Sequence, residues 1–175
     1  MLPYFMQSII LENQEEKAVL NNIQLVVYDF DGVMTDNRVI LREDGLESVV
    51  VNRSDGLAVS IIKNMGIPQM IMSKEQNKVV ETRARKLGIP VLKGIDNKQE
   101  VLIEHCRNKN ISLSNVVYIG NDINDVEVMR IVGHPVCPQD AYPEVRAISK
   151  FVIPVNGGSG VVRALLNYIE KREEA

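Results

Sequence analysis

Short apolar runs alternate with longer stretches of mixed polarity from residue 23 to the end of the chain. The run Ile23–Tyr28 is apolar at nearly every position, which is typical of a strand that is covered on both faces. Further short strands are predicted over residues 69–72, 90–92, 116–119, 134–136 and 151–153. Because helical stretches separate these strands, the pattern predicts a mostly parallel sheet whose connections are right-handed crossovers.

Capping and breaking residues mark the predicted helices. Asp55 is predicted to cap a helix that runs to about Asn64 and ends before Gly66 and Pro68. Other helices are predicted over residues 75–87, 97–108, 122–132 and 160–171. The sequence therefore predicts an α/β protein with a Rossmann-like three-layer fold.

A β-hairpin is predicted as an insertion after the first strand. Residues 38–41 and 47–51 are β-rich runs that flank the segment Arg42-Glu43-Asp44-Gly45. An Asp-Gly pair between two such runs is a strong hairpin signal. Residues 1–20 lie outside the alternation of strands and helices and are predicted to be an N-terminal extension or linker, whereas residues 21–175 form one domain.

The composition fits a single soluble globular domain, with 175 residues of which 45% are hydrophobic and 25% charged. The net charge of −3 gives no general attraction to nucleic acid or to anionic membranes, so neither partner is expected. Cys106 and Cys137 match no zinc pattern and are predicted to be reduced thiols. Without a long apolar run or a signal-peptide pattern, a cytoplasmic location is expected.

Polar residues that suit phosphate chemistry follow the predicted strands. Asp29 and Asp31 follow the first strand, Ser73 follows the second, Gly120–Asp125 follows a later one, and Lys98 opens a helix. In an open α/β sheet, ligands bind at the carboxyl ends of the strands. Taken singly, each residue also fits an ordinary turn, a helix cap or a solvated side chain. Their shared position after successive strands predicts one common site.

The expected chemistry follows from the charges at this site. Clustered carboxylates repel one another unless a cation neutralises them, and hard oxygen ligands of this kind suit Mg²⁺. Lys98 and Ser73 are placed to hold phosphoryl oxygens. A carboxylate aimed in line at phosphorus forms an aspartyl-phosphate, and a second carboxylate two residues later suits proton transfer to the leaving oxygen.

Four segments resemble the motifs of the haloacid dehalogenase-like phosphatase superfamily. They are Asp29-Phe30-Asp31-Gly32-Val33, Ser73, Lys98 and Gly120-Asn121-Asp122-Ile123-Asn124-Asp125. The resemblance spans roughly residues 23–170, and the short spacing between the first two motifs leaves no room for a large cap domain.

The resemblance implies a role for each matching residue. Asp29 would be the nucleophile and Asp31 the general acid and base, while Ser73 and Lys98 would bind phosphate. Asp125 would orient Lys98 or support the metal site. The implied Mg²⁺ ligands are Asp29, the backbone carbonyl of Asp31, and Asp122.

Three further segments resemble a capless subgroup of this superfamily. Residues 28–37, 52–56 and 157–160 look like those of 3-deoxy-D-manno-octulosonate 8-phosphate phosphatases. They look even more like the phosphatase-like domain attached to some bacterial acylneuraminate (CMP-sialic acid) cytidylyltransferases. The resemblance implies a homotetramer assembled by the hairpin, in which a neighbour covers the active site, and a possible cytidylyltransferase partner. Residues 157–160 are a candidate substrate-covering flap.

The substrate is expected to be a 2-keto-3-deoxy sugar acid phosphate. Subgroup members acting on nine-carbon acids resemble this chain at Glu75, Arg83 and Lys86, which favours N-acetylneuraminate 9-phosphate or deoxy-nonulosonate 9-phosphate and makes these three the candidate substrate-binding residues. Arg83 and Lys86 are three residues apart, so they are expected on one exposed helical face, from which they would pair with the substrate carboxylate of a neighbouring subunit. Two departures weaken that transfer: Lys74 replaces the usual glycine, and Asn121 replaces an aspartate, which lowers the negative charge near the metal. The eight-carbon substrate remains open, as does a non-catalytic role in oligomerisation or partnership with a cytidylyltransferase.

Overall fold

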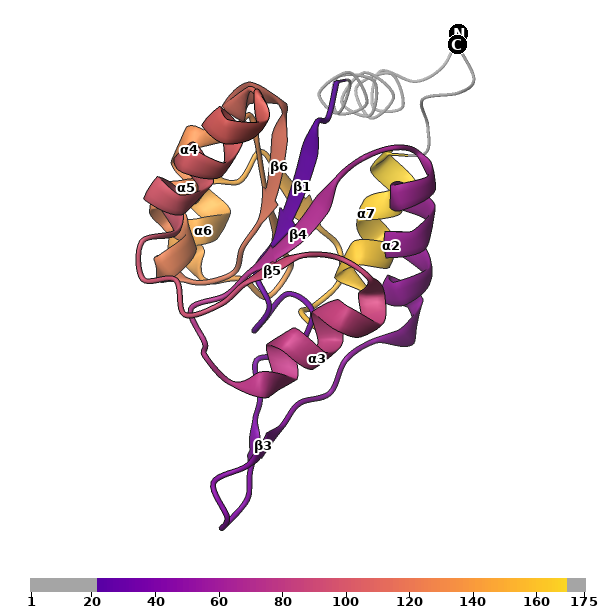
Figure 1. The fold of residues 1–175 in the computed structure, drawn as a ribbon, viewed down its shortest axis with the longest axis vertical. Coiled ribbons are helices and arrows are strands. Elements are labelled where there is room, and N and C mark those ends of the chain that lie inside the picture. Colours follow the sequence, from indigo (N-terminus) through magenta and orange to yellow (C-terminus); the bar gives the residue numbers. More distant parts are fainter. Residues whose placement is uncertain (1–21, 170–175) are drawn as a thin grey trace, which may run out of the picture.

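A computed structural model describes residues 22–169 of the chain. At its centre is a six-stranded sheet in the order β5-β4-β1-β6-β7-β8 (Figure 1). Every strand pairing within it is parallel, as the alternating pattern predicts. The strands are β1 Leu25–Tyr28, β4 Gln69–Met72, β5 Val91–Leu92, β6 Val116–Ile119, β7 His134–Pro138 and β8 Phe151–Ile153.

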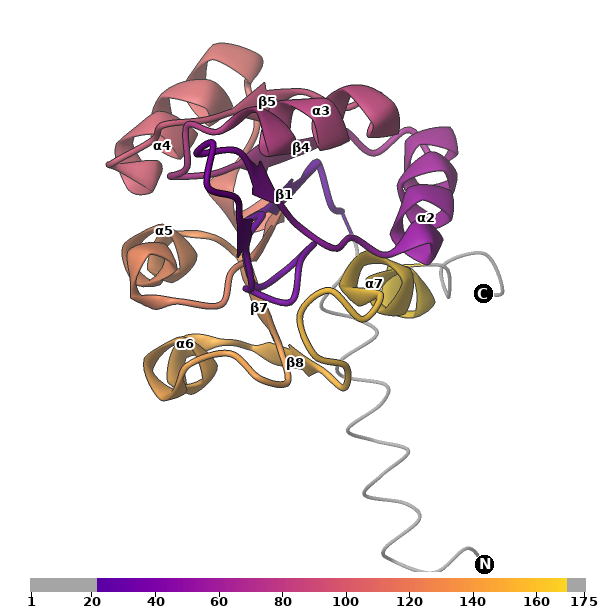
Figure 2. The same ribbon diagram turned by 90° about the horizontal axis from the view of Figure 1, so that it is seen from below.

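Helices cover both faces of this sheet, so the molecule has three layers (Figure 2). One layer holds α2 Arg53–Asn64, α3 Lys78–Leu87 and α7 Val161–Ile169; the other holds α4 Lys98–Lys109, α5 Val126–Ile131 and α6 Pro143–Ile148. Val26 and Tyr28 of β1 pack in the first core layer, and Leu25 and Val27 pack in the second. This double burial explains why the strand is apolar at successive positions. The Rossmann-like α/β fold is therefore confirmed.

The predicted capping role of Asp55 is wrong. The helix α2 begins earlier, at Arg53, and its cap is Asn52, whose side chain accepts a hydrogen bond from Ser54 N. Asp55 is fully buried instead, and its Oδ1 accepts a hydrogen bond from Arg163 N, in the first turn of α7, at 3.0 Å. The carboxylate therefore caps a helix that lies more than a hundred residues later in the chain.

Other element boundaries also differ from the prediction. α3 begins at Lys78 rather than at residue 75, because the Asn77 side chain caps it by accepting from Val79 N. The helix predicted over residues 122–132 is a 3₁₀ turn, η2 Ile123–Asp125, followed by α5. A second 3₁₀ turn, η1 Leu113–Asn115, and the helix α6 were not predicted. The predicted extension over residues 1–20 and the end of the last predicted helix lie outside the described residues.

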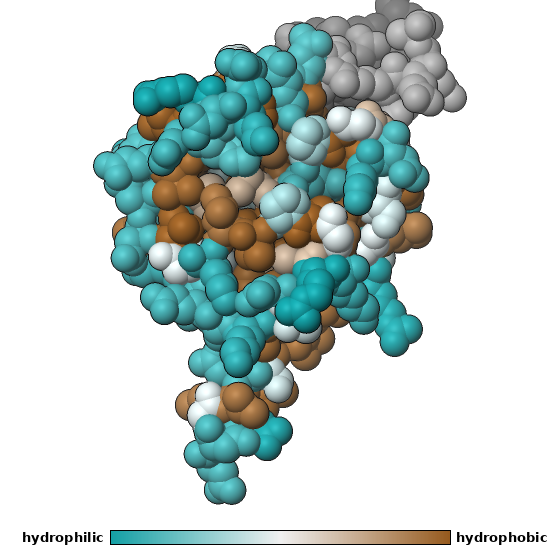
Figure 3. Space-filling model, in the orientation of Figure 1, coloured by the Kyte–Doolittle hydropathy of each residue, from teal (hydrophilic) through white to brown (hydrophobic). Residues whose placement is uncertain are grey.

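The predicted hairpin is present and projects away from the three layers (Figure 1). It pairs β2 Ile40–Leu41 with β3 Glu47–Ser48 in antiparallel fashion, so its strands are shorter than predicted. Gly45 at its tip has a φ of +79°, a conformation that favours glycine. Five large apolar side chains of this segment are more than half exposed (Figure 3): Val39, Ile40, Leu41, Leu46 and Val50. Within residues 22–169 no cap domain stands beside the hairpin.

Both cysteines are buried in the core and carry free thiols, as predicted. Among the helices that the structure describes, none has the length and apolar character needed to cross a membrane.

Candidate active site

The carboxyl ends of three neighbouring strands bring the predicted motifs together. β1 ends at Tyr28 just before Asp29, β4 ends just before Ser73, and β6 ends just before Gly120. Since these parallel strands lie side by side, the residues after them share one edge of the sheet. A pocket of about 310 Å³ opens there, lined by Asp29, Asp31, Asn37, Ser73, Lys74, Glu75, Asn121, Asp122, Ile123 and Asn124.

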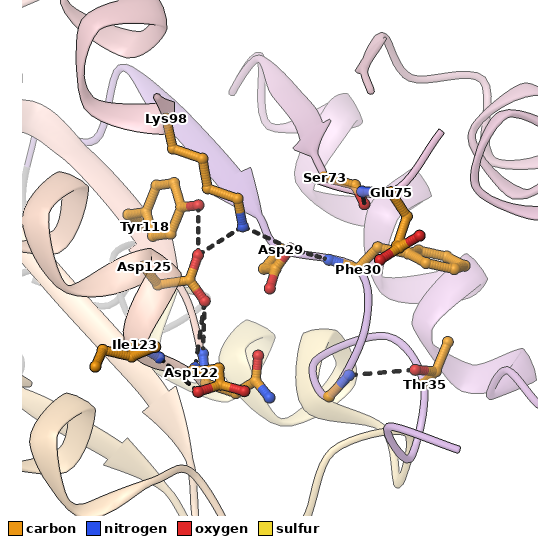
Figure 4. A network of polar contacts seen from close by, with 12 residues as sticks. Asp29, Phe30, Thr35, Ser73, Glu75, Lys98, Tyr118, Asp122, Ile123 and Asp125 are labelled. Carbon is orange, nitrogen blue, oxygen red and sulfur yellow. Dashed lines mark hydrogen bonds and ion pairs between the residues drawn. The ribbon is translucent and has the colours of Figure 1, made fainter. Parts of the chain in front are cut away.

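Lys98 lies at the floor of this site between two carboxylates (Figure 4). Its Nζ is 2.8 Å from Asp29 Oδ1 and 2.7 Å from Asp125 Oδ1, and its side chain is only 2% exposed. The hydroxyl of Tyr118 donates to the same Asp125 oxygen at 2.9 Å. The other Asp125 oxygen accepts from Asn121 N at 3.0 Å, so this buried carboxylate has a donor at each oxygen.

The charges at the floor of the site do not balance. Burial raises the pKa of Asp29 from 3.8 to about 8, the nearby Asp125 carboxylate adds to the rise, and Lys98 opposes it. One ammonium group faces two carboxylates, so the group carries a net negative charge when both are ionised. A divalent cation beside Asp29 would favour its ionised form, which is the form needed for attack on phosphorus.

Asp31 lies two residues after Asp29, at the side of the pocket. Burial raises the pKa of its carboxyl group, the Glu75 and Glu47 charges add to the rise, and a hydrogen bond from Thr35 opposes it. A carboxyl group with a raised pKa is a better proton donor near neutral pH. Asp31 therefore has the environment that a general acid requires.

Gly32 allows the chain to turn sharply after Asp31. Its φ is +78°, and a Cβ at this position would collide with the Asn121 side chain. Both facts require glycine. The turn is held by Thr35, whose Oγ1 accepts a hydrogen bond from Gly32 N at 3.2 Å. The Gly157-Gly158 segment packs against the same turn, and Gly158 N donates to Val33 O at 3.0 Å.

The contact of Asn121 with Asp29 and Asp31 is a feature that the sequence reasoning missed. Oriented with its nitrogen toward them, the Asn121 amide donates to Asp31 O at 2.8 Å and to Asp29 Oδ2 at 3.3 Å. Asp122 lines the same pocket, but its Oδ1 accepts from Ile123 N at 2.6 Å. A carboxylate, a backbone carbonyl and an amide thus converge on one point.

This donor set fits Mg²⁺, which binds few protein oxygens and keeps several waters. Within residues 22–169, His, Cys, Asp and Glu side chains form no group of three or more that would hold a metal ion by themselves. The set around Asp29 does not depend on such a group, because one ligand is a backbone carbonyl and another is an amide. Turning the Asn121 amide by 180° would present its oxygen in place of its nitrogen.

The remaining candidate residues lie in different surroundings. Ser73 is buried beside the pocket, and its Oγ accepts a hydrogen bond from Glu75 N at 3.1 Å. Glu75 lines the pocket, as expected of a substrate residue. Arg83 does not share an exposed face with Lys86, and that expectation is wrong: Arg83 is 9% exposed and its Nη2 donates to Asn52 O at 2.8 Å. Neither Arg83 nor Lys86 lines the pocket.

Tyr118 was also missed from the sequence. Its strand is apolar on both sides of it, so the residue looks like an ordinary core aromatic. The one available signal is its place two residues before Gly120, on a strand whose end carries the site. A buried phenol needs a hydrogen-bond partner, and the nearby carboxylates supply one.

The fold has three layers around a parallel sheet, with an Asp-x-Asp-Gly loop after the first strand and a buried lysine facing that loop. These features define a class of phosphate-transferring hydrolases. A family model described as haloacid dehalogenase-like hydrolase matches residues 67–165. The 3-deoxy-D-manno-octulosonate 8-phosphate phosphatase of Escherichia coli K12 is 31% identical over 153 residues, covering 87% of this chain and 81% of that protein. This chain belongs to the haloacid dehalogenase-like hydrolase family.

Solved structures agree with this assignment. A structure described as a HAD family hydrolase from Streptomyces avermitilis is 43% identical, with a TM-score of 0.83 and coverage of 86% of both chains. The 3-deoxy-D-manno-octulosonate 8-phosphate phosphatase of Moraxella catarrhalis, in complex with magnesium, phosphate and the sugar acid, is 29% identical, with a TM-score of 0.86 and coverage of 89% and 90%. These matches confirm the predicted enzyme class, a phosphatase, and agree with Mg²⁺ as its metal.

Proposed function

We propose that the chain is a Mg²⁺-dependent phosphatase that hydrolyses a sugar acid phosphate through an aspartyl-phosphate. The observation that carries this proposal is the position of Asp29, at the floor of the pocket with Lys98 Nζ 2.8 Å from its Oδ1. The second aspartate of the loop supplies a proton donor with a raised pKa. Phosphatases among the relatives support the same reaction class.

The reaction divides into two displacements at phosphorus. An Asp29 oxygen attacks phosphorus, the bond from phosphorus to the sugar oxygen breaks, and Asp31 donates its proton to that leaving oxygen. Asp31, now ionised, accepts a proton from water as the water oxygen attacks phosphorus. The bond from phosphorus to Asp29 breaks, which releases phosphate and restores both carboxyl groups. Lys98 and Ser73 would hold the phosphoryl oxygens during both steps.

Asp29, the carbonyl of Asp31 and the Asn121 side chain would hold the metal ion. Asp122 lines the same pocket and remains the predicted further ligand. When bound, Mg²⁺ supplies positive charge that offsets the phosphoryl oxygens and the carboxylates. Asp125, held by Tyr118 and by backbone N–H groups, would keep Lys98 in position rather than bind the metal.

Two classes of sugar acid phosphate, nine-carbon and eight-carbon, are the candidate substrates. Glu75, a feature of subgroup members that act on nine-carbon acids, lies in the pocket and supports N-acetylneuraminate 9-phosphate or deoxy-nonulosonate 9-phosphate. The named relatives support 3-deoxy-D-manno-octulosonate 8-phosphate equally. The pocket offers carboxylate, amide and hydroxyl groups that would bind the hydroxyls of either sugar.

The exposed hairpin supports a homotetramer. Ile40 and Leu41 are 62% and 69% exposed, which is unfavourable for a lone chain in water. A neighbour that packs on this hairpin would bury them, and Lys86 of such a neighbour remains a predicted substrate contact. A cytidylyltransferase partner also remains a prediction.

A phosphate-release screen tests the proposal. The purified protein with Mg²⁺ is offered eight- and nine-carbon 2-keto sugar acid phosphates, and we expect turnover of at least one. Asp29→Asn should lower that turnover by about a thousandfold or more, whereas Glu104→Gln, on the exposed face of α4, should not change it. Stable tetramers with no turnover of any substrate would favour the non-catalytic role instead.

A further inference from the structure

Lys74 occupies a fixed place at the mouth of the pocket. The residues on either side of it are tied to the loop after β5: Ser73 O accepts from Ile95 N at 3.1 Å, and Glu75 O accepts from Gly94 N at 3.1 Å. Glu75 N also donates to Ser73 Oγ at 3.1 Å. These bonds fix the backbone of residue 74, while its side chain is exposed and lines the pocket.

The charges that line the pocket make this lysine unusual. Four of the lining side chains are carboxylates: Asp29, Asp31, Glu75 and Asp122. Lys74 is the one cation among the described residues that line it. Lys98 is buried below the pocket, and its ammonium group is already paired with Asp29 and Asp125. A Mg²⁺ ion and Lys98 would therefore bind the phosphoryl group. Lys74 is closer to the solvent than Lys98 and remains available to the rest of the substrate.

The space for the rest of the substrate is also rich in carboxylates. A second pocket of about 220 Å³ shares Asp31, Asn37 and Glu75 with the first and extends to the base of the hairpin. It adds one carboxylate, Glu47, and one cation, Arg38. A substrate with a negative charge beyond its phosphate would be repelled here unless a cation met that charge.

Lys74 is free to meet such a charge. Within the part of the chain that the structure describes, its ammonium group takes part in no ion pair or hydrogen bond. Arg83, expected to bind the carboxylate, is buried and bonded to Asn52 O. Lys74 therefore combines an unpaired charge with a place in the same pocket as Asp29, whereas Arg38 lines only the second pocket.

We infer that Lys74 is a specificity-determining residue, whose ammonium group binds the carboxylate of an acidic sugar while Glu75 accepts hydrogen bonds from its hydroxyls. This inference rests on the proposed function, because it assigns the sugar end of the same substrate. It explains how a pocket lined by carboxylates accepts a substrate with two anionic groups. Polyol phosphates without a carboxylate would lose this contact.

The test compares two phosphates that differ only in the group that Lys74 is inferred to bind. D-gluconate 6-phosphate carries a carboxylate where D-glucitol 6-phosphate carries a hydroxymethyl group. Binding of each is measured by calorimetry in the Asp29→Asn background without Mg²⁺, so that neither the nucleophile nor the metal ion is present to allow hydrolysis. Turnover of each is measured separately with Asp29 in place and with Mg²⁺.

We expect tighter binding of the gluconate ester, and Lys74→Gln should reduce the ratio of the two dissociation constants about tenfold. Lys74→Glu should reverse the preference. The matched control is Lys78→Gln, since Lys78 is an exposed lysine at the start of α3 that lines neither pocket, and it should leave the ratio unchanged. In the turnover assay the Lys74→Gln effect should fall on KM rather than on kcat, because the contact is remote from phosphorus.

The outcomes separate the two proposals. Equal binding of the two esters, or a preference that survives Lys74→Gln, overturns the role of Lys74 even if the enzyme turns over both. A preference that depends on Lys74, without any turnover when Asp29 is present, supports the role of Lys74 and contradicts the proposed reaction.

Discussion

Two lysine–carboxylate pairs in this molecule have the same length but opposite surroundings. Lys98 Nζ lies 2.8 Å from Asp29 Oδ1, and Lys93 Nζ lies 2.8 Å from Glu81 Oε2. The side chains of the first pair are 2% and 7% exposed, whereas those of the second are 37% and 45% exposed. The distance alone therefore says little about what each pair contributes.

The pKa values of the two carboxyl groups show the difference. The pKa of Asp29 is raised because burial and Asp125 outweigh the attraction of Lys98. The pKa of Glu81 is lowered, chiefly by its hydrogen bond from Lys93, because water already solvates the charge. The buried group has an uncompensated negative charge when both of its carboxylates are ionised, and a bound metal ion would neutralise it. The surface pair needs no further partner, because water solvates both of its charges.

Removing the lysine of each pair should give the largest contrast. Lys98→Met leaves the buried carboxyl groups of Asp29 and Asp125 without their cation, and we expect the free energy of unfolding at neutral pH to fall by about 3–5 kcal/mol. Lys93→Met, on the surface, should change it little. Urea denaturation of both variants without metal measures the contrast. Equal losses would mean that burial does not distinguish the two pairs.

The pH dependence should differ in sign between the two pairs. Asp29 has a folded pKa of about 8 against an ordinary value of 3.8, so between these pH values the folded state holds a proton that the unfolded state has lost. Its contribution to stability therefore falls as pH rises from about 4 to 8. For Glu81 the folded pKa lies below its ordinary value of 4.5, so its contribution is present above that pH and lost as pH falls.

Mg²⁺ provides the measurement of this difference. Because the ion competes with the proton on Asp29, it should stabilise the protein more at pH 8 than at pH 6. At pH 8 and one hundred times its Kd, the whole stabilisation should be about 2.7 kcal/mol. Thermal unfolding with and without Mg²⁺ at both pH values measures this. Asp29→Asn should lose most of the Mg²⁺ effect, and Glu81→Gln should keep it. An Mg²⁺ effect of equal size at both pH values would contradict the assignment of Asp29 to the metal site.

The same contrast explains what the sequence was able to predict. Asp29, Ser73 and Asn121 follow strands that the apolar pattern predicts. Because parallel strands bring their carboxyl ends together, the sequence also predicts the common site. It predicts the hairpin as well, because an Asp-Gly pair determines the turn between its two neighbouring strands. These features depend on the periodicity of the chain or on a few neighbouring residues.

The features that were mispredicted depend on contacts between distant segments. Asp55 looks like a local cap, but it caps α7, whose first turn lies more than a hundred residues away. Arg83 looks like a solvated helix residue, but the packing of α3 beside α2 buries it against Asn52. In the sequence, Asn121 is only a replacement that removes the negative charge of an aspartate, whereas in the structure its amide contacts the Asp31 carbonyl. The sequence pattern alone does not reveal such partners.

The smallest expected effect comes from two tyrosines that differ in the same way as the two ion pairs. Tyr118 is fully buried, its pKa is raised well above the usual value, and its hydroxyl donates to Asp125 Oδ1 at 2.9 Å. Tyr118→Phe removes this one donor but leaves Lys98 on the same oxygen, so the unfolding free energy should fall by about 1 kcal/mol. Tyr142 is 52% exposed, so Tyr142→Phe should have no measurable effect on the unfolding free energy.

Urea denaturation of both variants measures the difference. A similar unfolding free energy for both would show that the hydrogen bond from Tyr118 to Asp125 adds nothing to stability. A loss as large as that of Lys98→Met would show that Tyr118 contributes as much as the lysine to the stability of the buried carboxylates.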